Sequence, residues 1–149
     1  LVPYGKIIDT DENCPTLTFN TIARHQSRIV RTRISSNKSP WLALTQVGDI
    51  YSVPISHGEG RFLASDELIA KLAANGQIAT QYVDLDGNAS NDIHFNPNDS
   101  VCAIEGITSP DGRVFGKMGH SERSGESLYK NVPGDYNIRM FEAAVKYFK

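Results

Sequence analysis

Hydrophobic and polar residues alternate along the first third of the chain with the period of two that is typical of β-strands. Over residues 29–34 the apolar and small side chains fall on one side of an extended backbone, and the arginines fall on the other. Apolar runs of strand length recur at residues 50–55 and 77–83. The pattern therefore predicts three strands, of which the first is half-buried.

Two segments instead show the period of an α-helix. Residues 66–75 have Ser65 or Asp66 as an N-terminal cap, and Gly76 follows them with the conformational freedom that ends many helices. Residues 138–148 predict a second helix, because their apolar side chains recur at helical spacing. The residues that share its apolar face are Ile138, Phe141, Val145 and Phe148.

A β-hairpin is predicted between the apolar runs at residues 101–107 and 114–118. The connecting residues 109–112 read Ser-Pro-Asp-Gly, which places Pro and Gly as a type I turn prefers. Residues 84–100 are polar and rich in Asn, Asp and Gly, so they predict a long surface loop. Because helices and strands are interspersed, we expect residues 1–149 to form one α/β domain with some antiparallel pairing.

Composition narrows the class of function. The formal net charge of -2 argues against bulk binding of nucleic acid, which needs a strong positive field. No stretch approaches the roughly 20 consecutive apolar residues of a membrane span, and the N-terminal residues lack the pattern of a signal peptide. The two cysteines show no paired spacing. We therefore expect no nucleic acid partner, no membrane partner and a cytoplasmic location.

Two His-x-Glu units carry the candidate chemistry. In Gly119-His120-Ser121-Glu122-Arg123 an extended backbone would project His120 and Glu122 to the same side, so that the carboxylate orients one imidazole nitrogen and leaves the other as a base. The second unit, His57-Gly58-Glu59-Gly60, has glycines that fit tight turns or close approach to a ligand. On spacing alone, a surface turn is the simpler explanation of the first unit, and a plain turn of the chain explains the second as well as a site does.

Other chemistries find less support in the sequence. Two His-x-Glu units could supply four metal ligands, but no H-E-x-x-H or C-x-x-C motif accompanies them and the zinc deaminase pattern is incomplete, so we expect no metal. Cys14 lies in a polar turn and Cys102 in a predicted apolar strand, and neither setting activates a thiol. The positive charge at Arg24–Arg33 fits either a solvated strand face or a contact with an acidic surface or a phosphate.

Several blocks of the chain, in the same order, resemble the amidotransferase domain of phosphoribosylformylglycinamidine synthase. Residues 104–123, with their Gly-Ile-Thr-Ser-x-Asp-Gly-Arg-Val stretch and His-x-Glu-Arg end, are similar to the terminal block of that family. Residues 96–100 match its Asn-Pro-Asn-Gly-Ser element, with Asp99 in place of Gly, and residues 54–61 match a further block. A looser block is matched by Leu17, Asn20, Arg24 and Arg28.

The resemblance implies the flavodoxin-like α/β fold of class I glutamine amidotransferases, with His120 as the general base and Glu122 as its orienter. The family's nucleophile is a cysteine in a Gly-x-Cys-Asn-Gly elbow upstream of a Gly-Leu-x-Pro-like stretch. Leu1-Val2-Pro3 looks like that stretch, so we expect the domain to be incomplete at its N-terminal side, without the nucleophile. Gly119 and Ser121 stand where many members have proline, which would make the turn more mobile.

The same resemblance implies that the parent protein is an ATP-dependent C-N ligase of de novo purine biosynthesis, with glutamine as amido donor. Ammonia released from glutamine would pass to a synthetase domain of the same parent protein, which binds ATP and magnesium, so this chain needs no cofactor. His57, Gly58, Glu59 and Gly60 would line the glutamine site or contact that domain. The chain alone is expected to be inactive. The alternative is a non-catalytic α/β binding or interaction module.

Overall fold

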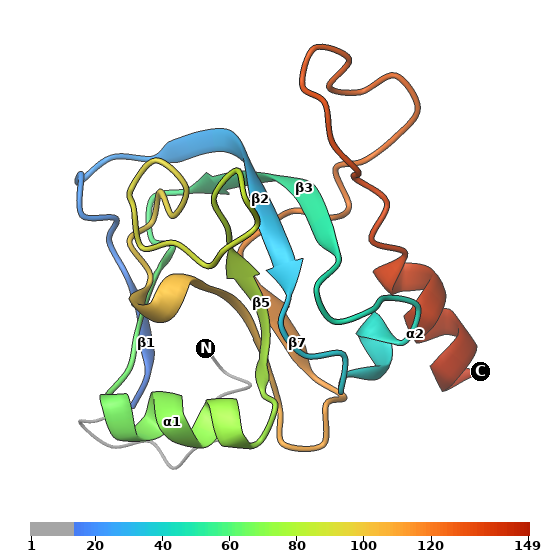
Figure 1. Cartoon of the computed structure of the whole chain (residues 1–149), viewed down its shortest axis with the longest axis horizontal. Coiled ribbons are helices and arrows are strands. Elements are labelled where there is room, and N and C mark those ends of the chain that lie inside the picture. The colour runs from blue at the N-terminus through green and yellow to red at the C-terminus, as the bar shows by residue number, and fades with distance from the viewer. Residues whose placement is uncertain (1–13) are drawn as a thin grey trace.

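The central feature of the fold is a five-stranded antiparallel sheet, which the computed structural model describes within residues 14–149 (Figure 1). The sheet comprises β2 (Gln26–Ile34), β3 (Ile50–His57), β5 (Ile78–Tyr82), β6 (Ile104–Thr108) and β7 (Phe115–Lys117), in the order β3-β2-β5-β6-β7. A separate two-stranded sheet pairs β1 (Thr16–Thr18) with β4 (Arg61–Leu63). The helices are α1 (Asp66–Ala74) and α2 (Met140–Phe148), with single 3-10 turns η2 (Pro40–Leu42) and η3 (Val101–Ala103).

The α/β class and the three predicted strands are confirmed. From Val30 onward alternate residues of β2 are buried, and Arg31 and Arg33 between them are partly exposed on the other face. Arg31 donates to the backbone carbonyl oxygens of Asp84 and Leu85 at 2.9 and 2.7 Å, and Arg33 donates to that of Gly87 at 3.2 Å. The arginines therefore hold the backbone of the 84–100 loop, a role that neither interpretation of the basic cluster anticipated.

Helix α1 follows its capping residues as predicted. The Ser65 hydroxyl accepts a hydrogen bond from the backbone N–H of Leu68 at 3.3 Å, and Gly76 adopts a φ of +66° just beyond the helix. Leu72 is the fully buried residue of α1 and packs with Phe62 and Ile104. Because each cap is satisfied by residues adjacent in the sequence, this element was predictable from local signals.

The hairpin is confirmed, although its first apolar run is divided. Strands β6 and β7 pair antiparallel, and the backbone N–H of Gly112 donates to the carbonyl oxygen of Ser109 at 2.9 Å across the predicted turn. The prediction that Cys102 lies inside a strand is wrong. Cys102 and Ala103 both have positive φ, at 52° and 55°, so they form the turn η3 and leave the Cys102 side chain exposed.

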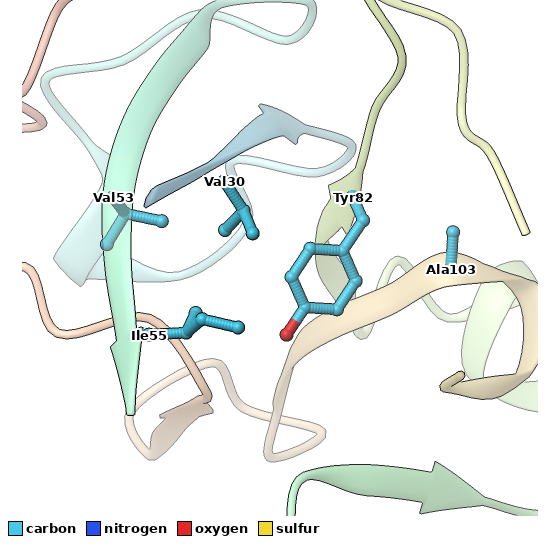
Figure 2. Close-up of a cluster of buried hydrophobic side chains, with 5 residues drawn as sticks. All are labelled: Val30, Val53, Ile55, Tyr82 and Ala103. Atoms are coloured by element: carbon cyan, nitrogen blue, oxygen red, sulfur yellow. The ribbon is translucent and has the colours of Figure 1, made fainter. Parts of the chain in front are cut away.

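One hydrophobic cluster packs β3, a strand that carries part of the site, against the strands beside it. Figure 2 shows Val30 of β2, Val53 and Ile55 of β3, Tyr82 of β5 and Ala103 gathered around the Tyr82 ring. All five are at most 5% exposed. Burying an aliphatic side chain of this size stabilises the fold by about 1.5–3 kcal/mol, so the cluster holds β3, which ends at His57, firmly in place.

Helix α2 forms where predicted, but its predicted apolar face is largely uncovered. Its buried residues are Met140, Ala143 and Ala144, and Met140 packs in a cluster with Ile34 and Leu42. Phe141, Val145 and Phe148 each remain about half exposed. Figure 1 shows the segment before α2 as a loop that projects from the sheet. No helix among residues 14–149 is long and apolar enough to cross a membrane.

The predictions made for Leu1-Val2-Pro3 and the N-terminal residues after it lie outside the described residues.

Candidate active site

A cleft of about 420 Å³ lies beside the end of β3, where strand β7 and the start of α2 also reach the surface. Both histidines of the His-x-Glu units line it, together with Glu122. Lys117, Met140 and Phe141 contribute other parts of its wall. The topology therefore joins two sequence motifs that lie more than sixty residues apart in a single cleft.

The His120–Glu122 pair forms at the rim of this cleft. The Nδ1 atom of His120 lies 2.7 Å from Oε1 of Glu122. The predicted reason for the pairing was an extended backbone, but the backbone N–H of Arg123 donates to the carbonyl oxygen of His120 at 3.0 Å, so the pair spans a turn. The backbone N–H of His120 donates to the carbonyl oxygen of Pro54 at 2.8 Å, which fixes the turn to β3.

The carboxylate of this pair favours its charged form. Partial burial by itself raises the pKa of Glu122, but the backbone N–H of Glu122 and the hydrogen bond from His120 together lower it below 4.5. An ionised Glu122 holds the proton on Nδ1 of His120 and leaves Nε2 available to exchange a proton with a ligand. This arrangement also stabilises an imidazolium when His120 accepts a proton.

His57 lies flat against His120. The ring centroids are 5.4 Å apart, with an angle of 14° between the planes. Burial first, and then the charge of His120, lower the pKa of His57, while a hydrogen bond with the Met118 backbone opposes the change. Neutral His57 therefore forms an uncharged wall beside His120, because two adjacent imidazolium rings would repel each other.

The other residues of the His57–Gly60 unit do not line the cleft. The Asn20 amide donates to the carbonyl oxygen of His57 at 2.7 Å and accepts the backbone N–H of Gly60 at 3.2 Å. A Cβ atom on Gly60 would lie 2.6 Å from the Asn98 side chain, so glycine is sterically required there. Gly58 accepts a hydrogen bond from the Asn20 backbone, whereas Glu59 is exposed.

The described residues supply acid–base chemistry but no cysteine nucleophile beside it. Neither Cys14 nor Cys102 is among the residues that line the cleft. Within residues 14–149 no group of three His, Cys, Asp or Glu side chains is arranged to hold a metal ion. What the cleft can do by itself is move a proton at His120 Nε2.

Sequence reasoning missed two charged residues behind His120. The side chain of Glu105 in β6 is fully buried, and that of Lys117 at the end of β7 is 8% exposed, with 3.3 Å between the Lys117 Nζ and a Glu105 oxygen. The available signal was the position of Glu105 within an apolar run, because a carboxylate buried among apolar residues needs a partner.

Comparisons with known proteins find relatives over most of the chain. Residues 1–148 match the model of a family described as the CobB/CobQ-like glutamine amidotransferase domain. The chain is 32% identical over 131 residues to phosphoribosylformylglycinamidine synthase subunit PurQ of Methanosarcina barkeri, covering 88% of this chain and 54% of that protein. It is 36% identical over 127 residues to the PurQ subunit of Chlorobaculum tepidum, covering 85% of this chain and 52% of the relative.

A solved structure shows the same fold. The structure of PurLQS from Thermotoga maritima matches with a TM-score of 0.67 and 25% sequence identity, covering 90% of this chain and 53% of that chain. The chain thus spans about half the length of the curated relatives and of the structural relative that it matches.

Proposed function

The chain belongs to the CobB/CobQ-like glutamine amidotransferase domain family, and we propose that it forms the His-Glu part of the glutaminase of phosphoribosylformylglycinamidine synthase. That enzyme would use ammonia from glutamine for the ATP-dependent amidation of formylglycinamide ribonucleotide in de novo purine biosynthesis. The observation that carries the proposal is the His120–Glu122 hydrogen bond of 2.7 Å, at the rim of a cleft, in the block that resembles the family's acid–base motif.

In the proposed reaction a cysteine thiolate attacks the carbonyl carbon of the glutamine side chain. When the carbon–nitrogen bond breaks, the imidazolium of His120 gives its Nε2 proton to the departing nitrogen, which leaves as ammonia, and a thioester remains. His120 then takes a proton from water, whose oxygen attacks the thioester and releases glutamate and the thiolate. Glu122 keeps the imidazole oriented and stabilises its charged form throughout.

His57 is assigned to the wall of the glutamine site in this proposal. Its neutral ring excludes water from one face of His120 and adds no competing charge. Glu59, which is exposed, is the residue of the same unit that we assign to contact with the synthetase.

In the same proposal the synthetase is the partner that binds ATP and magnesium, and the assembly is cytoplasmic.

The nucleophile must come from residues other than Cys14 and Cys102, because neither lines the cleft. We therefore expect residues 1–149 alone to produce no more glutamate from glutamine than their His120→Ala variant. Without a nucleophile, the base and its orienter give only residual catalysis. Glutamate formation by the purified chain above that of the variant would show that a thiol within these residues is catalytic.

The proposal is tested in a full-length protein that contains this chain, mixed with the synthetase. We expect glutamine-dependent amidation of formylglycinamide ribonucleotide with equal release of glutamate. A mixture that uses ammonium salts but neither consumes glutamine nor changes when the chain is omitted would favour the alternative, a non-catalytic interaction module. Sequencing upstream of Leu1 adds an independent check, because the proposal requires a cysteine elbow there.

A further inference from the structure

The turn that carries His120 rests on a buried pair of opposite charges. The Glu105 side chain is fully buried, and one of its oxygens accepts the backbone N–H of Gly119 at 2.5 Å. The same oxygen lies 3.3 Å from Nζ of Lys117, and the second oxygen accepts the hydroxyl of Thr80. Both oxygens of the carboxylate are therefore occupied by groups within the fold.

Lys117 binds the residues on both sides of His120, at the backbone of Gly119 and at the side chain of Ser121. Besides Glu105, its ammonium group donates to the carbonyl oxygen of Gly119 at 3.1 Å and to the hydroxyl of Ser121 at 3.0 Å. Two hydrogen bonds thus run from the ammonium group to the turn, and the Glu105 carboxylate lies within ion-pair distance of it. Lys117 lines the cleft, but its polar contacts are made with the turn and with Glu105, so it serves the turn rather than a ligand.

Stability alone does not explain the pair. Removing a carboxylate and an ammonium from water costs several kcal/mol each, and a hydrophobic pair of similar volume often stabilises a fold equally well or better. A hydrophobic pair, however, supplies no directional bonds. Here those bonds end on Gly119 and Ser121, the two residues adjacent to His120 in the sequence.

The hydrogen bonds made by Glu105 and Lys117 matter because one of the residues they hold is a glycine, Gly119. A Cβ atom at this position would lie 2.6 Å from Val53 and 2.9 Å from the Glu105 carboxylate, so the turn can come this close only with glycine. Glycine leaves the backbone free to move when nothing holds it. The backbone N–H and carbonyl oxygen of Gly119 are instead both bound, the first to Glu105 and the second to Lys117.

We propose that Glu105 and Lys117 are positioning residues that hold the His120 turn in the geometry needed for proton transfer to the departing ammonia. The inference rests on the proposed glutaminase function. Its specific consequence is that loosening the pair lowers kcat for glutamine while leaving the KM for glutamine and the ammonium-dependent rate near their original values. A displacement of about 1 Å at a reacting group costs up to about a hundredfold in rate.

The test uses the full-length protein with its synthetase and a double variant, Glu105→Gln with Lys117→Met. The side-chain amide introduced by Glu105→Gln retains an acceptor for the Gly119 N–H, and the double variant leaves no unpaired charge in the interior. Both hydrogen bonds from Lys117 to the turn are lost. We expect the glutamine-dependent kcat to fall about tenfold to a hundredfold. Ser121→Ala leaves the buried pair whole, removes one bond and should lower kcat about two- to tenfold. Lys71→Met, on exposed α1, is the matched control and should have no effect.

A second measurement reports the position of the His120 ring without requiring enzyme activity. In protein with ¹⁵N-labelled histidine, the His120 Nδ1 proton, bonded to Glu122, should give a downfield NMR signal that broadens or disappears in the double variant and persists in Lys71→Met. If the double variant fails to fold, with the ammonium-dependent rate lost as well, Ser121→Ala decides by the same two measurements. Unchanged kcat and an unchanged signal in the folded variants would overturn the proposal. A His120→Ala variant that retains glutamine-dependent activity would instead refute the proposed function. The NMR result would still show whether Glu105 and Lys117 position His120.

Discussion

The two His-x-Glu units share one local pattern, a histidine near the end of a strand with a glutamate two residues later, but their side chains differ in environment. In the first, the His57 carbonyl is bound by Asn20, the ring stacks on His120, and Glu59 is exposed with no ion pair to any described residue. In the second, the chain turns at once and brings Glu122 to 2.7 Å from His120. The backbone after the histidine, and not the spacing, determines whether the pair forms.

The largest predicted difference between the two units concerns their glutamates. Glu122→Gln keeps the size of the side chain but removes the charge that stabilises the imidazolium, so glutamine-dependent turnover should fall strongly. The loss should not exceed the roughly hundredfold to ten-thousandfold expected for loss of the acid–base group itself. The matched variant Glu59→Gln should leave glutamine hydrolysis within about twofold of wild type, because Glu59 does not line the cleft.

The readout is steady-state release of glutamate by the full-length enzyme, with ammonium-dependent synthesis as the measure of folding. If Glu59→Gln reduced hydrolysis as much as Glu122→Gln, the two units would be equivalent in function and the comparison would fail.

A smaller effect concerns how the first unit is held. Asn20→Ala removes side-chain bonds to the carbonyl oxygens of His57 and Arg24 and to the Gly60 backbone N–H, in a residue that is 2% exposed. Leaving such buried groups unpaired should lower the free energy of unfolding by about 2–3 kcal/mol. Denaturant unfolding checks this, with Asn88→Ala on the exposed loop as the control, and equal unfolding midpoints for the two variants would contradict it.

The smallest effect is a change in pH dependence at His57. Burial lowers the folded-state pKa of His57 below 6.5, so the unfolded chain binds a proton more readily than the folded one. This contribution to stability is therefore complete above about pH 6.5 and is lost as the pH falls toward the folded pKa. The Tm of His57→Phe should thus decrease less between pH 7 and pH 5 than the Tm of the wild type, with measurements at pH 8 as baseline. A larger decrease in the variant would show that the pKa of His57 is raised by folding and not lowered.

The parts of the fold that were predictable depend on residues close together in the sequence. Ser65 and Gly76 delimit α1, and Ser109–Gly112 forms the hairpin turn, because each uses bonds between near neighbours. Cys102 was misplaced because two successive residues with positive φ leave no trace in an apolar run. The arginines of β2 bind carbonyl oxygens more than fifty residues away, which no local pattern reveals.

The same limit applies to the site. The His120–Glu122 pairing was predicted, although the backbone between them is a turn and not a strand. The position of His57 beside His120 could not be predicted without knowing the topology. The turn after β7 is brought to β3 by the hydrogen bond from the His120 backbone N–H to the Pro54 carbonyl oxygen. The departures at Gly119 and Ser121 predicted a mobile turn, whereas both residues are hydrogen-bonded to Lys117.

The central claim is that His120, and not its stacked neighbour His57, transfers the proton. The most direct measurement compares His120→Ala and His57→Ala in the full-length enzyme, with glutamine and with ammonium salts as nitrogen source on one preparation. We predict that His120→Ala lowers the glutamine-dependent rate by about a hundredfold to ten-thousandfold while the ammonium-dependent rate is kept, and that His57→Ala costs much less. Equal loss with both nitrogen sources in folded His120→Ala, or a larger loss of the glutamine-dependent rate in His57→Ala, would contradict the assignment.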